Sequence, residues 1–247
     1  MYGVTVPGHV DRTYRQSLSF RNYYNFTVKI SETDLYILAD SDLSDLAFQS
    51  ALRCRVQIEE YIQIHPEFRT SLVPVSSDEL APEIIKDMLK ASRAARVGPM
   101  ASVAGAIAEH VGRDLLKKSA NVIVENGGDI FLNVKDNVSV GIFAGDSPLT
   151  GRIALSIDAI ETPLGICTSS GTVGHSLSFG SADAVCIKSK SASLADAAAT
   201  SVGNLIKKKI DVKTGLERAM SIQGVLGVLI IKGDTLAVQG SMELRKP

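Results

Sequence analysis

Two adjacent glycines, Gly127 and Gly128, separate two short apolar runs near the middle of the 247-residue chain. The runs carry the β-branched and aromatic residues that are typical of strands. Paired glycines between strands indicate a sharp bend, or a backbone that lies against something leaving no room for a side chain. With Asn126 before them and Asp129 after them, the turn could present N–H groups and polar oxygens to a ligand. An ordinary strand-to-strand turn is the alternative, because Gly, Asn and Asp are common turn residues.

Composition limits the classes of protein to consider. Apolar residues are 45% and charged residues 21%, which permits a packed core without disulfides or metals. The net charge is −1 and the only basic run is 207–209, so we expect no nucleic-acid partner. The three cysteines are far apart, which fits a reducing cytoplasm. We find no signal-peptide core and no run of about 18 apolar residues, so we expect a cytoplasmic protein without a membrane partner.

Hydrophobic periodicity predicts an α+β chain with β-hairpins near both ends. Alternating residues predict a hairpin over 26–39 with a four-residue loop, and a closing hairpin over 225–238 with a two-residue turn. Helical spacing predicts helices over 43–63 and 104–115. Strands and helices alternate irregularly, which favours a single α+β domain over a parallel doubly wound sheet.

Three further stretches carry candidate ligand contacts. The first is the start of the 104–115 helix, which is rich in small residues. There Gly105 could let a ligand approach the backbone, or it could allow close helix–sheet packing.

The second stretch is a loop dense in hydroxyls and glycine, with no G-x-S-x-G nucleophile motif. Ser169 and Ser170 could donate hydrogen bonds to phosphate or ribose oxygens, and Gly171 could let the ligand close in. His175 could contact the ligand as a base, or it could be a loop histidine without a function.

The third stretch is a helix expected around 193–206. Asp196 and Thr200 are four residues apart, so both oxygens lie on one helix face and could form half of a site for a hard cation such as Mg²⁺. The alternative is structural, because Ser193-x-x-Asp196 has the spacing of a capping box.

Taken together, these stretches resemble the ApbE superfamily, whose founding members are flavin transferases. The resemblance rests on the small-residue helix start, the Gly-Gly-Asp turn, the Thr-Ser-Gly loop and an Ala-Asp-Ala-x-Ala-Thr helix, here 103–109, 125–130, 168–171 and 194–200. More closely, the chain is similar to the UPF0280 branch of that superfamily, through 32–35, His65-Pro66 and 97–108.

The resemblance implies a two-lobed fold of mixed sheets packed with helices. It also implies one domain over 1–247, in which about 1–97 forms the N-terminal hairpin and helices and about 98–247 the core with a cleft. The Gly-Gly-Asp turn and the Thr-Ser-Gly loop would face FAD, as substrate or ligand. Mg²⁺ would be held on the pyrophosphate by Asp196 and Thr200. The implied activity is a Mg²⁺-dependent FAD:protein FMN transferase, or other processing of a flavin nucleotide, in the cytoplasm.

Three departures from the flavin transferases support an alternative. Glu109 stands where they carry a lysine, Glu125 stands where they commonly carry an asparagine, and the His175 segment lacks their Asp-Pro pair. The alternative is a catalytically diverged flavin- or nucleotide-binding or accessory protein. Resemblance to the UPF0280 branch implies one form of this alternative, a role in sulfur metabolism beside sulfide-dependent homocysteine formation. A partner protein and a homo-oligomer are also compatible with the sequence.

Overall fold

The structure is a computed structural model that describes residues 23–171 and 180–246. Its main sheet has eight strands, and every pairing in the described part of the chain is antiparallel. The sheets were expected to be mixed, and in the described residues they are antiparallel: hairpins join neighbouring strands at both ends of the chain, and long helical segments connect residues 39 to 122 and 189 to 225. The order across the sheet is β1 (Tyr24–Ile30), β2 (Thr33–Ala39), β3 (Val122–Asn126), β4 (Asp129–Asn133), β7 (Leu164–Ser169), β8 (Ala184–Ser189), β9 (Val225–Lys232) and β10 (Thr235–Gly240).

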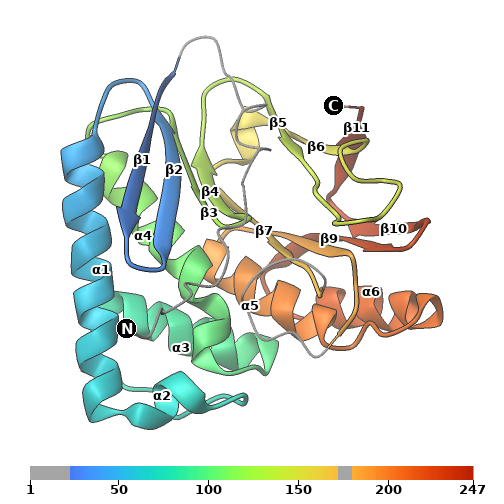
Figure 1. Cartoon of the computed structure of the whole chain (residues 1–247), viewed down its shortest axis with the longest axis horizontal. Helices are drawn as coiled ribbons and strands as arrows, with labels where there is room; N and C mark the ends of the chain where they lie inside the picture. Colours follow the sequence, from blue (N-terminus) through green and yellow to red (C-terminus); the bar gives the residue numbers. More distant parts are fainter. Residues whose placement is uncertain (1–22, 172–179, 247) are drawn as a thin grey trace, which may run out of the picture.

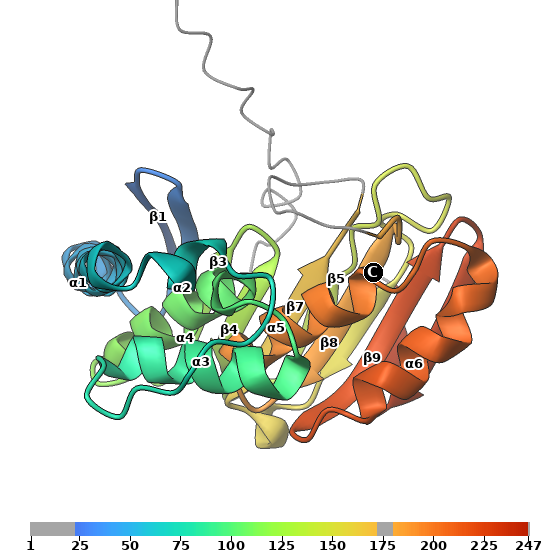
Figure 2. The same cartoon turned by 90° about the horizontal axis from the view of Figure 1, so that it is seen from below.

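Helices cover one face of this sheet, and a smaller sheet covers part of the other (Figures 1 and 2). The helices are α1 (Ser44–Ile64), α2 (Pro66–Thr70), α3 (Glu83–Ala95), α4 (Val103–Leu115), α5 (Ala192–Gly203) and α6 (Val212–Met220), with short 3-10 turns at Pro99–Ser102, Ala159–Glu161 and Lys209–Asp211. The smaller sheet has the order β11 (Glu243–Arg245), β6 (Ala154–Ile157) and β5 (Val138–Gly141).

The two faces of the main sheet bury two separate apolar clusters. Along β4 the side chains alternate, so Phe131 joins the helical cluster while Ile130 and Leu132 join the cluster beneath the small sheet. This is the period-two pattern of a strand buried on both faces. The helical cluster contains residues from Val28 to Ile230, so its packing unites the two ends of the chain.

Most predicted elements are present, with one clear error at the first hairpin. The expected four-residue loop is a two-residue turn at Ser31 and Glu32, with Ser31 at φ 50°. Thr33 is a turn residue by composition, but it pairs with Ile30 and is 4% exposed. Burial of this strand start against α1 overrides local propensity. In the described part of the chain, no helix is long and apolar enough to cross a membrane.

Candidate functional site

The Gly-Gly turn connects β3 to β4 in two residues. Gly127 and Gly128 have φ values of 70° and 108°, which other residues rarely adopt, so the turn itself requires both glycines. The Glu125 carboxylate accepts a hydrogen bond from the backbone N–H of Gly128 at 2.8 Å and is 2% exposed. The buried Glu125 side chain therefore stabilises the turn by a hydrogen bond to its backbone.

Asn126 and Asp129 are paired across this hairpin and contact two different elements. The Asn126 side chain donates to the carbonyl of Ala104 in the first turn of α4, at 3.1 Å. Asp129 is registered against Cys167 on β7. The turn is thus fixed between the start of α4 and the neighbouring strand.

The second acid of the site comes from α5. The Asp196 carboxylate accepts the backbone N–H of Gly105 at 2.9 Å, in the first turn of α4. A Cβ atom on Gly105 would lie 2.3 Å from the Ala192 carbonyl oxygen and 2.8 Å from Cβ of Asp196. The space beside Gly105 is therefore filled by α5, so Gly105 allows the close packing of two helices.

The capping-box interpretation of Asp196 is wrong. The N-cap of α5 is Ser191, whose hydroxyl accepts from the N–H of Leu194 at 3.2 Å. Asp196 lies in the second turn and uses its carboxylate on the other helix. Thr200 follows one turn later and is partly exposed.

Asp129 and Asp196 form an acidic pair with shifted proton affinities. Both residues keep some exposure, yet protein encloses their carboxylates, and this burial raises the pKa of Asp196 to about 7. N–H groups of Gly105 and Ala104 act in the opposite direction on that pKa. Burial also raises the pKa of Asp129 well above its usual range, and the charge of Asp196 raises it further. The pair therefore holds protons more tightly than two exposed carboxylates would.

Cys167 is a contact that sequence reasoning missed. Its thiol hydrogen-bonds to Asp129 and donates to the carbonyl of Ala192 at 3.3 Å. Burial, followed by the Asp129 charge, raises the pKa of this thiol well above its usual range. The thiol stays protonated, and its single S–H can be donated to the Ala192 carbonyl or to the Asp129 carboxylate, but not to both at once. The available signal was its position next to Thr168, at the end of a strand leading into the hydroxyl-rich loop.

Glu109 is a second acid between α4 and α5. It lies on α4 and contacts the start of α5, whereas Asp196 lies on α5 and contacts the start of α4. It is 1% exposed, and its carboxylate accepts from the Ser191 hydroxyl at 3.1 Å and from the N–H of Ser193 at 3.2 Å. Arg113, one turn further along α4, provides the counter-charge at 2.5 Å. Glu109 thus caps the start of α5, while Asp196 caps the start of α4.

The hydroxyl-rich loop begins at the end of β7, with Ser169 and Ser170 partly exposed. The Gly171 N–H donates to the Ala182 carbonyl at 2.9 Å, and a Cβ on Gly171 would lie 2.5 Å from the carbonyl oxygen of Gly180. The close approach at Gly171 is therefore made by the chain itself. His175 lies outside the described residues.

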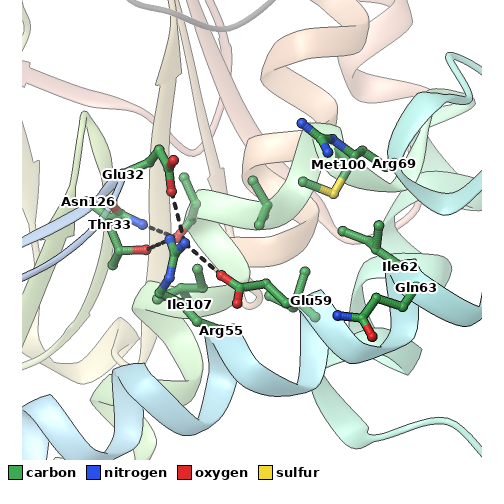
Figure 3. Close-up of a pocket in the computed structure, with 13 residues that line it drawn as sticks. Glu32, Thr33, Arg55, Glu59, Ile62, Gln63, Arg69, Met100, Ile107 and Asn126 are labelled. Atoms are coloured by element: carbon green, nitrogen blue, oxygen red, sulfur yellow. Dashed lines mark hydrogen bonds and ion pairs between the residues drawn. The ribbon is translucent and has the colours of Figure 1, made fainter. Parts of the chain in front are cut away.

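A cleft of about 660 Å³ adjoins this junction (Figure 3). Its walls come from α1, α2, the β1–β2 turn and the first half of α4. Ala104 and Asn126 line it, so it ends beside the turn that holds Asp129. Arg55 lies among Glu32, Thr33 and Glu59, with ion pairs of 2.9 Å to Glu32 and 2.7 Å to Glu59.

Within residues 23–171 and 180–246, no group of three or more His, Cys, Asp or Glu side chains is arranged to hold a metal ion. A cation at the acidic pair would therefore need further oxygen ligands from Thr200, from the backbone or from a substrate.

The same fold occurs in two solved structures of ApbE proteins. The flavinyl transferase ApbE of Pseudomonas stutzeri superposes with a TM-score of 0.60 at 13% identity, over 88% of this chain and 94% of that one. The ApbE protein of Thermotoga maritima gives a TM-score of 0.55 at 13% identity, over 89% and 97%. The fold is therefore that of the ApbE superfamily.

Sequence comparison narrows the family. The family model described as "AbpE bacteria" matches residues 15–237. A UPF0280 protein of Methanococcus aeolicus is 43% identical over 221 residues, 87% of this chain and 89% of that protein. A UPF0280 protein of Methanopyrus kandleri is 42% identical over 224 residues, 88% and 90% of the two chains. The chain therefore belongs to the ApbE superfamily, in its UPF0280 branch.

Proposed function

We propose that this protein is a Mg²⁺-dependent enzyme that processes a flavin nucleotide, with FAD as its substrate. The observation that carries the proposal is the acidic pair of Asp129 and Asp196 beside the first turn of α4. The fold shared with a flavinyl transferase supports the choice of flavin as the substrate class. The reaction would break the pyrophosphate of FAD, release AMP, and transfer FMN to a hydroxyl of a target protein or to water.

The chemistry of the donor set fits Mg²⁺. Asp129, Asp196 and the Thr200 hydroxyl are hard oxygen donors, and proteins often hold Mg²⁺ with one or two carboxylates together with substrate phosphates. The raised pKa values of both carboxyls mean that ionising the pair is unfavourable without a counter-charge, which a cation would supply. When bound, Mg²⁺ would offset the charge of the pyrophosphate and of the leaving phosphate.

The chain's own groups would position the nucleotide. The start of α4 directs backbone N–H groups and the positive end of its dipole toward the acidic pair, which favours a nearby phosphate. Ser169 and Ser170 are partly exposed, and their hydroxyls would donate to phosphate or ribose oxygens. In this proposal His175 and Gly171 belong, with Ser169 and Ser170, to the loop that contacts the nucleotide. Asn126 and the Cys167 thiol would hold the turn and Asp129 in place.

Incubation with FAD tests the proposal. We expect purified protein with Mg²⁺ to release AMP from FAD, measured by chromatography, and chelation to stop the release. Asp129→Asn and Asp196→Asn should each lower the rate at least a hundredfold, because each removes a charge needed to hold the cation. Asp146→Asn, which changes an exposed loop acid, is the control and should keep the wild-type rate. Release of neither AMP nor FMN by the wild type would reject the enzymatic proposal.

A second candidate is a diverged flavin- or nucleotide-binding accessory protein. It is favoured by Glu109, which is buried and engaged with α5 at a position where the flavin transferases carry a lysine. In that case FAD raises the melting temperature, but no AMP is released. A role beside sulfur or homocysteine metabolism, in the cytoplasm and with a partner protein, belongs to this candidate. Light scattering would test whether the protein is a homo-oligomer.

A further inference from the structure

A run of three lysines lies in the connection between α5 and α6 (Figure 1). Lys207 and Lys208 belong to no helix, and Lys209 opens the short 3-10 turn that precedes α6. All three residues are exposed. Lys209 pairs with Asp234, whereas no carboxylate in the described part of the chain forms an ion pair with Lys207 or Lys208. Two cations of this connection are therefore open to an anion from outside.

The backbone that carries these two lysines is held from both sides. The Asp211 carboxylate accepts the N–H groups of Lys207 and Lys208 at 3.0 and 2.7 Å, and these hydrogen bonds are the main cause of its lowered pKa. On the other side, the Ser181 N–H donates to the Ile206 carbonyl at 2.7 Å, and the Ser181 hydroxyl donates to the Lys207 carbonyl at 2.9 Å. A partner would therefore meet a loop whose backbone is already ordered, which lowers the entropic cost of binding.

The same connection leaves one isoleucine in water. Ile206 and Val212 are 0% and 5% exposed, so the chain buries its apolar residues before and after the lysines, but Ile210 is 82% exposed. A single exposed apolar residue is ordinary on a protein surface. Here it accompanies two lysines without carboxylate partners, and we call Lys207, Lys208 and Ile210 the lysine surface. It offers two charges and one apolar contact within four residues of sequence.

The small extent of the lysine surface distinguishes between classes of anionic partner. Nucleic acids are bound over a broad basic face through many phosphate contacts, and the net charge of this chain is −1. Anionic membranes attract clusters of about four to eight basic residues. A short acidic segment of a protein needs less, because a few carboxylates can pair with the two lysines while an apolar side chain covers Ile210.

We propose that the lysine surface binds an acidic segment of another protein, with carboxylates on Lys207 and Lys208 and an apolar side chain on Ile210. Charge pairs at an exposed surface speed the encounter of the two proteins and weaken as the salt concentration rises. The proposal is independent of the flavin chemistry proposed above, because none of these three residues takes part in it.

Fluorescence anisotropy with a labelled peptide tests this proposal. The probe consists of three Glu-Glu-Leu-Glu repeats, and the matched peptide has glutamine in place of every glutamate. We expect the glutamate peptide to bind at least tenfold more tightly at low salt, and its affinity to fall as salt is added. Changing both Lys207→Glu and Lys208→Glu should weaken binding at least tenfold, and Ile210→Ser should weaken it severalfold.

The control is the double change Lys117→Glu and Lys118→Glu, which reverses the same charge at two adjacent exposed lysines that follow α4. This variant should bind the glutamate peptide like the wild type, and both double variants should keep the wild-type circular dichroism spectrum. The proposal is overturned if the glutamine peptide binds equally well or if both double variants lose affinity equally. It is also overturned if single-stranded RNA or phosphatidylserine vesicles bind to Lys207 and Lys208 more tightly than the peptide does.

Release of AMP from FAD separates this proposal from the enzymatic one. The assay contains no peptide, so the variant with Lys207→Glu and Lys208→Glu should release AMP at the wild-type rate. Failure of the peptide to bind would thus leave the FAD result unchanged, and failure to cleave FAD would leave the peptide result unchanged. A loss of AMP release in this variant would show that the two lysines serve the nucleotide and would overturn their assignment to a protein partner.

Discussion

Glu109 and Asp196 have matching positions but different surroundings. Each acid lies in the second turn of one helix and accepts an N–H from the first turn of the other, Glu109 from α5 and Asp196 from α4. Glu109 has Arg113 as a counter-charge and hydroxyl donors around it. Asp196 instead faces a second acid, Asp129, and its pKa is raised to about 7, chiefly by burial.

The difference separates a structural acid from a functional candidate. Glu109 is satisfied by groups of the chain itself, so it needs nothing from outside. The Asp129–Asp196 pair is costly in its ionised form and would gain stability from the cation proposed to bind there. Two acids in equivalent helix positions can therefore have opposite roles, and only their charged neighbours distinguish them.

The largest expected effect comes from changing Glu109. Glu109→Lys would place an ammonium against the positive start of α5 and beside Arg113, so we expect a loss of about 4 kcal/mol or failure to fold. Glu109→Gln keeps hydrogen-bonding capacity and should lose about half as much. Chemical denaturation measures both. If Glu109→Lys folds normally and gains affinity for FAD, Glu109 is a ligand contact and the comparison is wrong.

The acidic pair should make stability depend on pH. Both folded-state pKa values exceed the unfolded value of about 4, so the stabilising protons are held below pH 4 and lost as the pH rises through about 7. Without Mg²⁺, the melting temperature should therefore fall between pH 5 and pH 8. Asp129→Asn should remove the Asp129 share of this fall and gain about 2 kcal/mol at pH 8, and the share from Asp196 should remain because burial causes it.

Mg²⁺ supplies the matching test of the same pair. Millimolar Mg²⁺ should raise the melting temperature of the wild type at pH 8 more than at pH 5, because protons compete with the cation at low pH. Asp129→Asn should abolish the response. An equal Mg²⁺ response in wild type and variant would show that the cation binds elsewhere.

Contact between the two helices is tested at Gly105. Gly105→Ala adds a Cβ 2.3 Å from the Ala192 carbonyl oxygen, so α4 and α5 must separate. We expect a loss of about 1–2 kcal/mol after the gain in helix propensity is counted. Gly141→Ala is the control, because nothing lies within 4 Å of its added Cβ. A neutral Gly105→Ala would mean that the junction is looser than described.

The smallest effect is expected at Arg113. Its side chain is 57% exposed, so solvent screens much of its pairing with Glu109. Arg113→Ala should cost about 0.5–1 kcal/mol, measured by denaturation at low salt, and less at high salt. A cost near that of Glu109→Lys would show that the counter-charge, and not the cap, dominates this side of the junction.

Periodicity predicted the elements well, because each depends on neighbours in the sequence. The helix expected over 104–115 is Val103–Leu115, and the one expected over 43–63 is Ser44–Ile64. The two-residue turn at the closing hairpin is also present, at Gly233 and Asp234. Turn chemistry and apolar spacing are local signals, and they survive folding wherever packing agrees with them.

The partners of the site residues could not be predicted in this way. Asp196 contacts Gly105 across 91 residues, and no local pattern encodes that contact. From the sequence, Glu109 was only a negative charge at a position where the flavin transferases carry a lysine. The structure shows that it is buried among hydrogen-bond donors.

The mutual capping of α4 and α5 determines the order in which the two helix starts can be completed during translation. Glu109 is made before α5, so α5 finds its cap already present when it emerges from the ribosome. The start of α4 must wait 91 residues for Asp196. We therefore expect a nascent chain that ends before α5 to hold an incomplete α4 with unpaired N–H groups. The last third of the polypeptide thus finishes a helix that lies in the middle of the gene product.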